Sequence, residues 1–157
     1  MSAGNNDRPE AVSLSSPALD AIRRHGQETY PHECCGALIG YAEDPPLILV
    51  ALPLPNNTDE GPRRRFLIRP NDYREAEAAA KSAELTLLGF YHSHPDHPAQ
   101  PSQHDLDHAW PNMHYLIASV QQGRFEVIRA WYLRDDRSAF DELPLTIVPQ
   151  LEGSATR

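Results

Sequence analysis

The sequence has few cysteines, few basic residues and no long apolar run. Its only two cysteines, Cys34 and Cys35, are adjacent, and neighbouring side chains leave an extended backbone in opposite directions. We therefore expect two reduced thiols and no disulfide, which favours a cytoplasmic location. The longest apolar run, LILVAL, is far too short to span a bilayer, and the start, MSAGNNDRPE, lacks the pattern of a signal peptide.

The balance of charge is acidic. A formal net charge of −8 repels phosphate backbones, so we expect no nucleic-acid partner, and we expect no membrane partner either. One basic stretch, Arg63–Arg65, stands out. A solvated loop is the favoured interpretation of this stretch, and a docking surface for a protein partner is the alternative.

The length of 157 residues fits one domain with its own core. We expect this domain over residues 13–149, with flexible polar tails over residues 1–12 and 150–157. Helix-forming and capping residues predict helices over residues 15–30, 71–85 and 102–110, with Asn71 as the cap of the second. Short apolar runs predict strands over residues 35–41, 47–54, 65–70, 86–94, 114–120, 124–133 and 143–149. This order favours an α+β fold, a largely antiparallel sheet flanked by helices.

Histidine and aspartate gather in one segment, GFYHSHPDHPAQPSQHDLDHAW, which holds five of the eight histidines. His92 and His94 are two residues apart at the end of a predicted strand, so both imidazoles project to the same side. Prolines keep the following loop extended until a helix begins at Ser102, and Asp105 shares a face of that helix with Ser102. Two imidazoles and a carboxylate suit zinc and leave a fourth position for water. The segment therefore predicts a catalytic metal site at His92, His94 and Asp105.

Other interpretations of these residues stay open. The stretch SQHD is also a helix-capping pattern, with serine at the N-cap and an acid three residues later. His104 and His108 have the spacing of a zincin pair, but aspartate replaces the usual glutamate and no third ligand follows, so we rank this pair lower. His97, His104 and His108 fit better as exposed residues or as donors behind the ligands. A thiol nucleophile at Cys34 or Cys35 is a further alternative, although small buried cysteines are ordinary in cores.

A hydrolytic zinc site also needs a base that takes a proton from water and passes it to the leaving amine. Glu33 is our candidate, because it lies between the first predicted helix and the first predicted strand, where it could stand beside His92 and His94. A solvated acid in a turn is an equally simple interpretation. Position along the chain does not choose between the two.

The pattern resembles the JAMM motif of the MPN-domain metalloproteases (Mov34/MPN/PAD-1 family). It consists of Glu33, the run His92-Ser93-His94-Pro95, Ser102 and Asp105. Seven residues separate His94 from Ser102 and two separate Ser102 from Asp105, which matches that motif at every position. The segments HECCGALIGY, PNNT, RRRFLIRPNDY and LLGFYHSHPDHPAQPSQHDLDHAWPNMHYLIAS look like the compact bacterial branch of the family. The resemblance covers most of residues 13–133.

The resemblance implies a cytidine-deaminase-like MPN fold and zinc-dependent cleavage of amide bonds after the C-terminal Gly-Gly tail of a ubiquitin-like or sulfur-carrier protein. By matching position it implies zinc ligands at His92, His94 and Asp105, a water-activating base at Glu33, and an oxyanion-stabilising hydroxyl at Ser102. An amidase acting on small amino-acid conjugates is one alternative function. A non-catalytic MPN scaffold is another, and the complete motif disfavours it.

Overall fold

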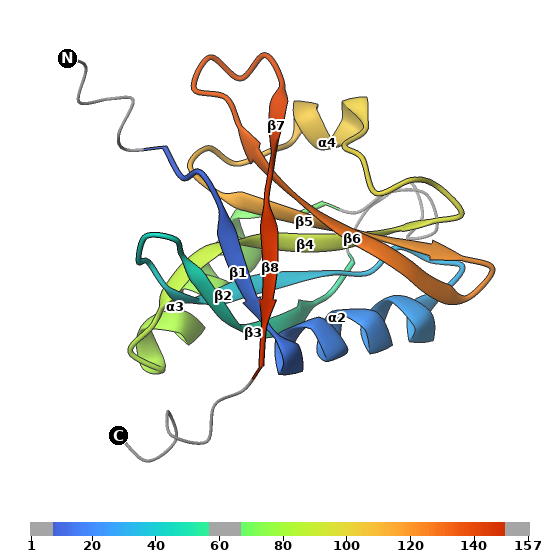
Figure 1. The fold of residues 1–157 in the computed structure, drawn as a ribbon, viewed down its shortest axis with the longest axis horizontal. Helices are drawn as coiled ribbons and strands as arrows, with labels where there is room; N and C mark the ends of the chain where they lie inside the picture. The colour runs from blue at the N-terminus through green and yellow to red at the C-terminus, as the bar shows by residue number, and fades with distance from the viewer. Residues whose placement is uncertain (1–7, 57–66, 150–157) are drawn as a thin grey trace.

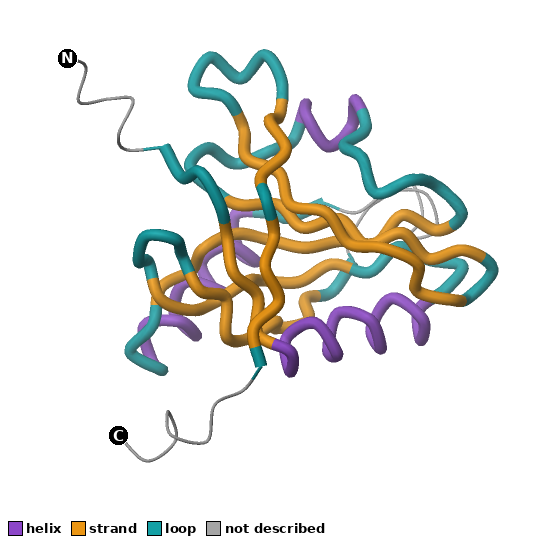
Figure 2. The backbone as a smooth tube through the Cα atoms, in the orientation of Figure 1, coloured by secondary structure: helices purple, strands orange, loops and turns teal. Residues whose placement is uncertain are grey.

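The computed structural model describes residues 8–56 and 67–149, and this part of the chain forms one eight-stranded sheet with three helices (Figures 1 and 2). The elements in chain order are β1 (Val12–Ser15), α2 (Ser16–Thr29), β2 (Cys35–Tyr41), β3 (Leu47–Leu54), α3 (Pro70–Ser82), β4 (Thr86–Pro95), α4 (Gln103–Asp107), β5 (His114–Gln121), β6 (Arg124–Leu133), β7 (Phe140–Leu143) and β8 (Leu145–Val148). None of the helices in these residues is long and apolar enough to cross a membrane.

The sheet is mixed, in the strand order β7-β6-β5-β4-β2-β3-β1-β8. Four neighbouring pairs are antiparallel: β2 with β3, β2 with β4, β5 with β6, and β6 with β7. Three pairs are parallel: β1 with β3, β1 with β8, and β4 with β5. Strands β1 and β8 come from distant parts of the chain and lie side by side (Figure 1). Strand β4 lies inside the sheet, paired with β2 on one edge and with β5 on the other.

The two long helices cover opposite faces of the sheet. Helix α2 packs on one face through Ala18 and Ile22, and helix α3 packs on the other through Ala76 and Ala80. Side chains alternate along a strand, so successive residues of β4 belong to different faces. Tyr91 belongs to the core on the α2 side and Phe90 to the core on the α3 side. The strand therefore directs every second residue after Phe90, which includes His92 and His94, to the α3 side.

Most predicted elements are confirmed, and with them the α+β fold class. The first helix begins one residue later than predicted, because Ser15 is its N-cap and accepts a hydrogen bond from Ala18 N over 3.2 Å. Strands β5 and β6, both predicted, are joined by a tight hairpin turn in which Gln122 and Gly123 have positive φ.

Two expectations about the chain before the second helix are wrong. The predicted strand over residues 65–70 does not form at Leu67–Arg69, which pair with no strand; residues 65 and 66 lie outside the described residues. Ile68 is instead buried beside α3, and its carbonyl accepts a hydrogen bond from the Trp110 indole. Asn71 is not the cap of α3, because Pro70 already occupies the first turn and Asp72 accepts a hydrogen bond from Arg69 N over 3.0 Å.

Candidate metal centre

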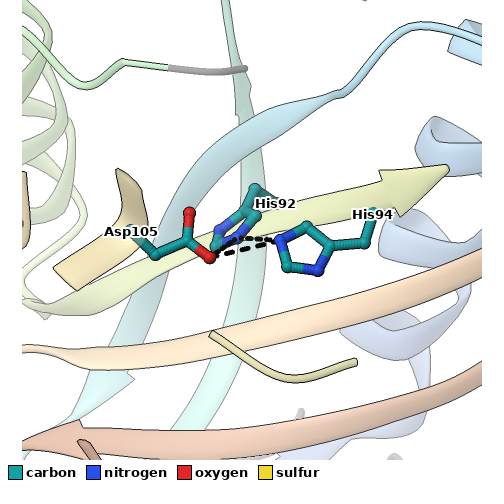
Figure 3. Close-up of side chains that lie close together, drawn as sticks. All are labelled: His92, His94 and Asp105. Carbon is teal, nitrogen blue, oxygen red and sulfur yellow. Dashed lines mark hydrogen bonds and ion pairs between the residues drawn. The ribbon is translucent and has the colours of Figure 1, made fainter. Parts of the chain in front are cut away.

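Strand β4 and helix α4 bring three metal-binding side chains together. His92 and His94 project from the same face of β4, and Asp105 reaches them from the first turn of α4 (Figure 3). All three side chains are buried. One ligand atom from each lies within 4.8 Å of the other two, and no other group of three or more His, Cys, Asp or Glu side chains gathers in this way within residues 8–56 and 67–149.

The cap of α4 determines where the Asp105 carboxylate lies. Asp105 N donates to Ser102 Oγ over 3.1 Å, and Ser102 N donates to Asp105 Oδ2 over 2.8 Å. These two bonds form a reciprocal capping box at the start of the helix. The same Oδ2 atom faces both histidines. The capping interpretation of SQHD and the ligand interpretation are therefore both compatible with the structure, because the cap fixes the carboxylate at the cluster.

One polar atom from each of the three side chains forms a corner of a nearly equilateral triangle. His92 Nε2 and His94 Nε2 lie 3.2 Å apart, and they lie 3.3 Å and 3.2 Å from Asp105 Oδ2. On its other side, His94 Nδ1 is 2.9 Å from the carbonyl oxygen of Pro98. A carbonyl oxygen only accepts hydrogen bonds, so Nδ1 is the donor, and the neutral tautomer that matches this bond leaves Nε2 without a proton on the side of the cluster.

The electrostatics of the cluster favour the protonation states that bind metal. Burial lowers the pKa of His92 below its ordinary value, against the opposing influence of Asp105, so the imidazole is neutral at neutral pH. Burial on its own would raise the pKa of the Asp105 carboxyl, but its close contacts with the two imidazoles favour the ionised form and hold that pKa well below its usual range. A neutral imidazole and an ionised carboxylate are the forms that ligate a metal.

These residues fit a metal ion. Lone pairs on two imidazole nitrogens and a carboxylate oxygen converge, and such groups repel one another unless a proton or a cation lies between them. Donor atoms about 2.0–2.2 Å from a tetrahedral zinc lie roughly 3.3–3.6 Å from each other, and the observed separations of 3.2 to 3.3 Å are close to the short end of this range. The donor set of two nitrogens and one carboxylate oxygen is also one that zinc accepts.

Glu33 lies in the turn that leads into β2, next to the strand that carries the histidines. The turn is joined to β4 by two hydrogen bonds, from Ser93 N to Cys34 O over 3.1 Å and from Cys34 N to Ser93 Oγ over 2.9 Å. Asn56 donates to the Glu33 carbonyl over 3.0 Å from the end of β3. The half-buried Glu33 is thus held beside the C-terminal half of β4. The second predicted catalytic residue, Ser102, is exposed at the start of α4.

The rival groups are not assembled for catalysis. Burial raises the pKa of the Cys34 thiol to about 11 and also raises that of Cys35, so both are protonated at neutral pH. The rings of His104 and His108 lie against each other at a tilt of 36° with centroids 4.3 Å apart, and His108 Nδ1 donates to the backbone carbonyl of His104 over 2.9 Å. The described residues offer this pair no third ligand. The basic stretch Arg63–Arg65 lies outside the described residues.

The sequence did not predict the backbone and side-chain groups that hold the metal-binding residues in place. The Pro98 carbonyl orients His94, but a backbone atom leaves no signature in the sequence. The pairing of Ser93 with Cys34 was also missed, because it depends on the antiparallel register of β2 and β4, in which Cys35 lies opposite His92. The prolines that separate the predicted ligands gave a signal only for an extended loop.

Comparison with known proteins gives one family. A family model described as prokaryotic homologs of the JAB domain matches residues 15–134. Desampylase of Haloferax volcanii is 36% identical over 113 residues, which cover 69% of this chain and 80% of the relative. A probable TtuB-protein conjugate cleaving protease of Thermus thermophilus is 34% identical over 99 residues, which cover 63% of this chain and 64% of the relative.

A solved structure shows the same fold. A JAB1/MPN domain protein from Archaeoglobus fulgidus superimposes with a TM-score of 0.58 at 19% identity, over 88% of this chain and 98% of that protein. At this level of identity the likeness establishes the fold alone. The family model and the desampylase relative, which share the segment containing the histidine and aspartate cluster, complete the assignment: the chain belongs to the prokaryotic homologs of the JAB domain.

Proposed function

We propose that this chain is a zinc metallopeptidase that hydrolyses the amide bond after the C-terminal Gly-Gly tail of a ubiquitin-like or sulfur-carrier protein. The observation that carries the proposal is the buried triangle of His92, His94 and Asp105. Membership of the JAB family supports it, as do the names of two relatives, a desampylase and a probable TtuB-protein conjugate cleaving protease.

His92, His94 and Asp105 would hold the zinc. Three protein ligands are typical of catalytic zinc, whereas structural zinc sites usually have four. When bound, zinc supplies a Lewis acid that lowers the pKa of water to about 7 and so provides a nucleophile at neutral pH. The lowered pKa of His92 supports this role, because a neutral imidazole presents a lone pair without first losing a proton. The bond from His94 Nδ1 to Pro98 O supports it as well, because it leaves Nε2 as the ligating atom of that ring.

Glu33 is proposed to act as the base and then as the acid. Its carboxylate takes a proton from the attacking water and delivers it to the departing amine. Its backbone is held by Asn56 and, through Cys34, by Ser93, so the side chain starts from a fixed point next to β4. General acid–base catalysis of this kind contributes about 10²- to 10⁴-fold in rate.

Ser102 is proposed to stabilise the oxygen that becomes negative as water adds to the amide carbon. The bond from Asp105 N uses a lone pair of Ser102 Oγ, so the hydroxyl proton is available for donation to the substrate. Its exposure at the start of α4 gives the substrate access to this group. Loss of one such donor typically costs about 10²- to 10³-fold in turnover.

The test compares wild type with Glu33→Gln on a Gly-Gly-ending carrier protein fused to a short peptide, with zinc content measured on the same samples. We expect the variant to keep its zinc and to lose at least about 10²-fold in cleavage rate. Unchanged turnover would remove Glu33 from the mechanism. Cleavage of small glycyl amino-acid conjugates, but not of the carrier fusion, would favour the amidase alternative. Absence of cleavage on both substrates by a zinc-loaded wild type would favour a scaffold.

A further inference from the structure

Three consecutive backbone carbonyls in the loop between β4 and α4 each accept a hydrogen bond. His97 O accepts from Ser119 Oγ over 2.6 Å and, over a longer 3.3 Å, from Gln121 Nε2. Pro98 O accepts from His94 Nδ1 over 2.9 Å, and Ala99 O accepts from Trp131 Nε1 over 3.1 Å. The bond to Pro98 O orients a side chain of the metal centre, and the two flanking bonds from Ser119 and Trp131 hold the loop on either side of it.

The donors of the two flanking bonds belong to the sheet. Ser119 is on β5, directly opposite His94 in the parallel pairing of β4 and β5, and its side chain is buried. Trp131 is on β6, the next strand along. Strands inside a paired sheet move less than a loop does, so these two donors fix the height of the loop above the sheet. The Pro98 carbonyl between them then has one position relative to His94.

The position of that carbonyl matters for metal binding. A histidine ligand whose second nitrogen donates to a fixed acceptor keeps one tautomer and one ring orientation, and the acceptor makes the ligating nitrogen more basic. In this chain the acceptor is the backbone carbonyl of Pro98, and its position depends on how the loop backbone is held. Other groups must therefore hold it.

We infer that Ser119 and Trp131 are positioning residues of the metal centre: they clamp the 97–99 loop so that the Pro98 carbonyl holds His94 with Nε2 directed at Asp105. The inference rests on the proposed function, because it takes His94 as a metal ligand. It assigns to two residues outside the JAMM motif an effect on metal affinity. Neither residue touches the metal or the substrate.

A role in folding alone is the competing explanation of these two bonds, and the affinity for metal separates that role from positioning. The variants are Ser119→Ala and Trp131→Phe, each of which removes one donor. Ser119→Thr is the matched control, because it retains the hydroxyl. Leu143→Ala is the control for stability, since Leu143 is a buried residue of β7 whose loss weakens the core without touching the loop.

The measurement is the affinity of the purified protein for zinc, by competition with a chromophoric chelator, together with the visible absorption spectrum of the cobalt-loaded protein. We expect Ser119→Ala and Trp131→Phe each to bind zinc about tenfold more weakly and to change the cobalt spectrum. A tenfold change is about the low end of the effect of residues that orient a metal ligand. Ser119→Thr and Leu143→Ala should bind zinc as wild type does.

The outcomes distinguish this inference from the proposed function. Wild-type affinity and an unchanged cobalt spectrum in both donor-deletion variants would overturn the role of Ser119 and Trp131 and leave the zinc site in place. A matching loss of affinity in Leu143→Ala would also overturn it, because general loosening would then explain the effect. Failure of the wild-type protein to bind zinc would contradict the metal centre itself. If Ser119→Ala does not fold, Trp131→Phe decides the question.

Discussion

At the scale of single residues, substitutions of the neighbours Glu33 and Cys34 distinguish a metal mechanism from a thiol mechanism. Burial raises the pKa of Cys34 to about 11, so at pH 7.5 the reactive thiolate is a very small fraction. We predict that Cys34→Ala retains hydrolysis within about threefold and that iodoacetamide does not inactivate the native wild type. The Glu33→Gln variant, by contrast, should be inactive. Loss of activity in Cys34→Ala with folding and zinc content intact would restore the thiol interpretation.

The sequence was sufficient to predict His92, His94 and Asp105 as a cluster because the determinants are local. Alternation along a strand aims the two imidazoles, and a capping box fixes the carboxylate only eleven residues after His94. The groups that position the Pro98 carbonyl, which orients His94, were not predictable in this way. Ser119 and Trp131 reach the loop only because β5 pairs with β4 and β6 pairs with β5, and a single stretch of sequence does not show which strands will be neighbours in the sheet.

At the scale of elements, the contact between β4 and β5 depends on Gly89. A Cβ atom at this position would lie 1.9 Å from the carbonyl oxygen of His114 on the neighbouring strand, which cannot move without breaking the strand pairing. We predict that Gly89→Ala lowers the free energy of unfolding by about 3 kcal/mol, the upper end for overpacking. Urea unfolding followed by circular dichroism measures this.

The matched control for this glycine is Gly123→Asn. Gly123 has φ of 85° in the β5–β6 turn, a conformation that asparagine tolerates, and an added Cβ would meet Tyr30 only at 3.9 Å. We expect a loss below about 1 kcal/mol for this variant. Equal stability of Gly89→Ala and wild type would contradict this close approach of β4 and β5 at Gly89.

Elements with a strong local pattern were predictable, and elements defined by their partners were not. Helix α3 follows from its run of helix formers, and the β5–β6 hairpin follows from its turn residues. Strand β1 is only four residues long and is set by parallel pairing with β3 and β8, which no local pattern reveals. The run around Ile68 looked like a strand because it is apolar, but its burial comes from packing beside α3.

At the scale of the whole molecule, His114 makes stability depend on pH. The ring is buried against Tyr132, and its Nδ1 atom has no hydrogen-bond partner among the residues that the structure describes. Burial lowers the pKa of His114 to about 4, compared with about 6.5 in the unfolded chain. Between these two values the unfolded state binds a proton that the folded state does not, so stability falls as the pH falls from 6.5 to 4.

We predict that His114→Phe reduces this acid sensitivity. Phenylalanine keeps a ring against Tyr132 and cannot be protonated. The wild type should lose on the order of 3 kcal/mol more than the variant between pH 6.5 and pH 4, at about 1.4 kcal/mol per pKa unit, and the two should run parallel above pH 7. Urea unfolding at a series of pH values measures the difference. Parallel curves below pH 6.5 would show that His114 is protonated in the folded protein.

The central claim for the whole molecule is that β4 and α4 meet to form a metal centre. The most direct test is anomalous diffraction at the zinc absorption edge from crystals of the zinc-loaded protein. We predict one strong peak among His92 Nε2, His94 Nε2 and Asp105 Oδ2, at about 2.0–2.2 Å from each atom. Crystals that show no peak there, with the three side chains directed apart or the zinc bound elsewhere, would contradict the claim.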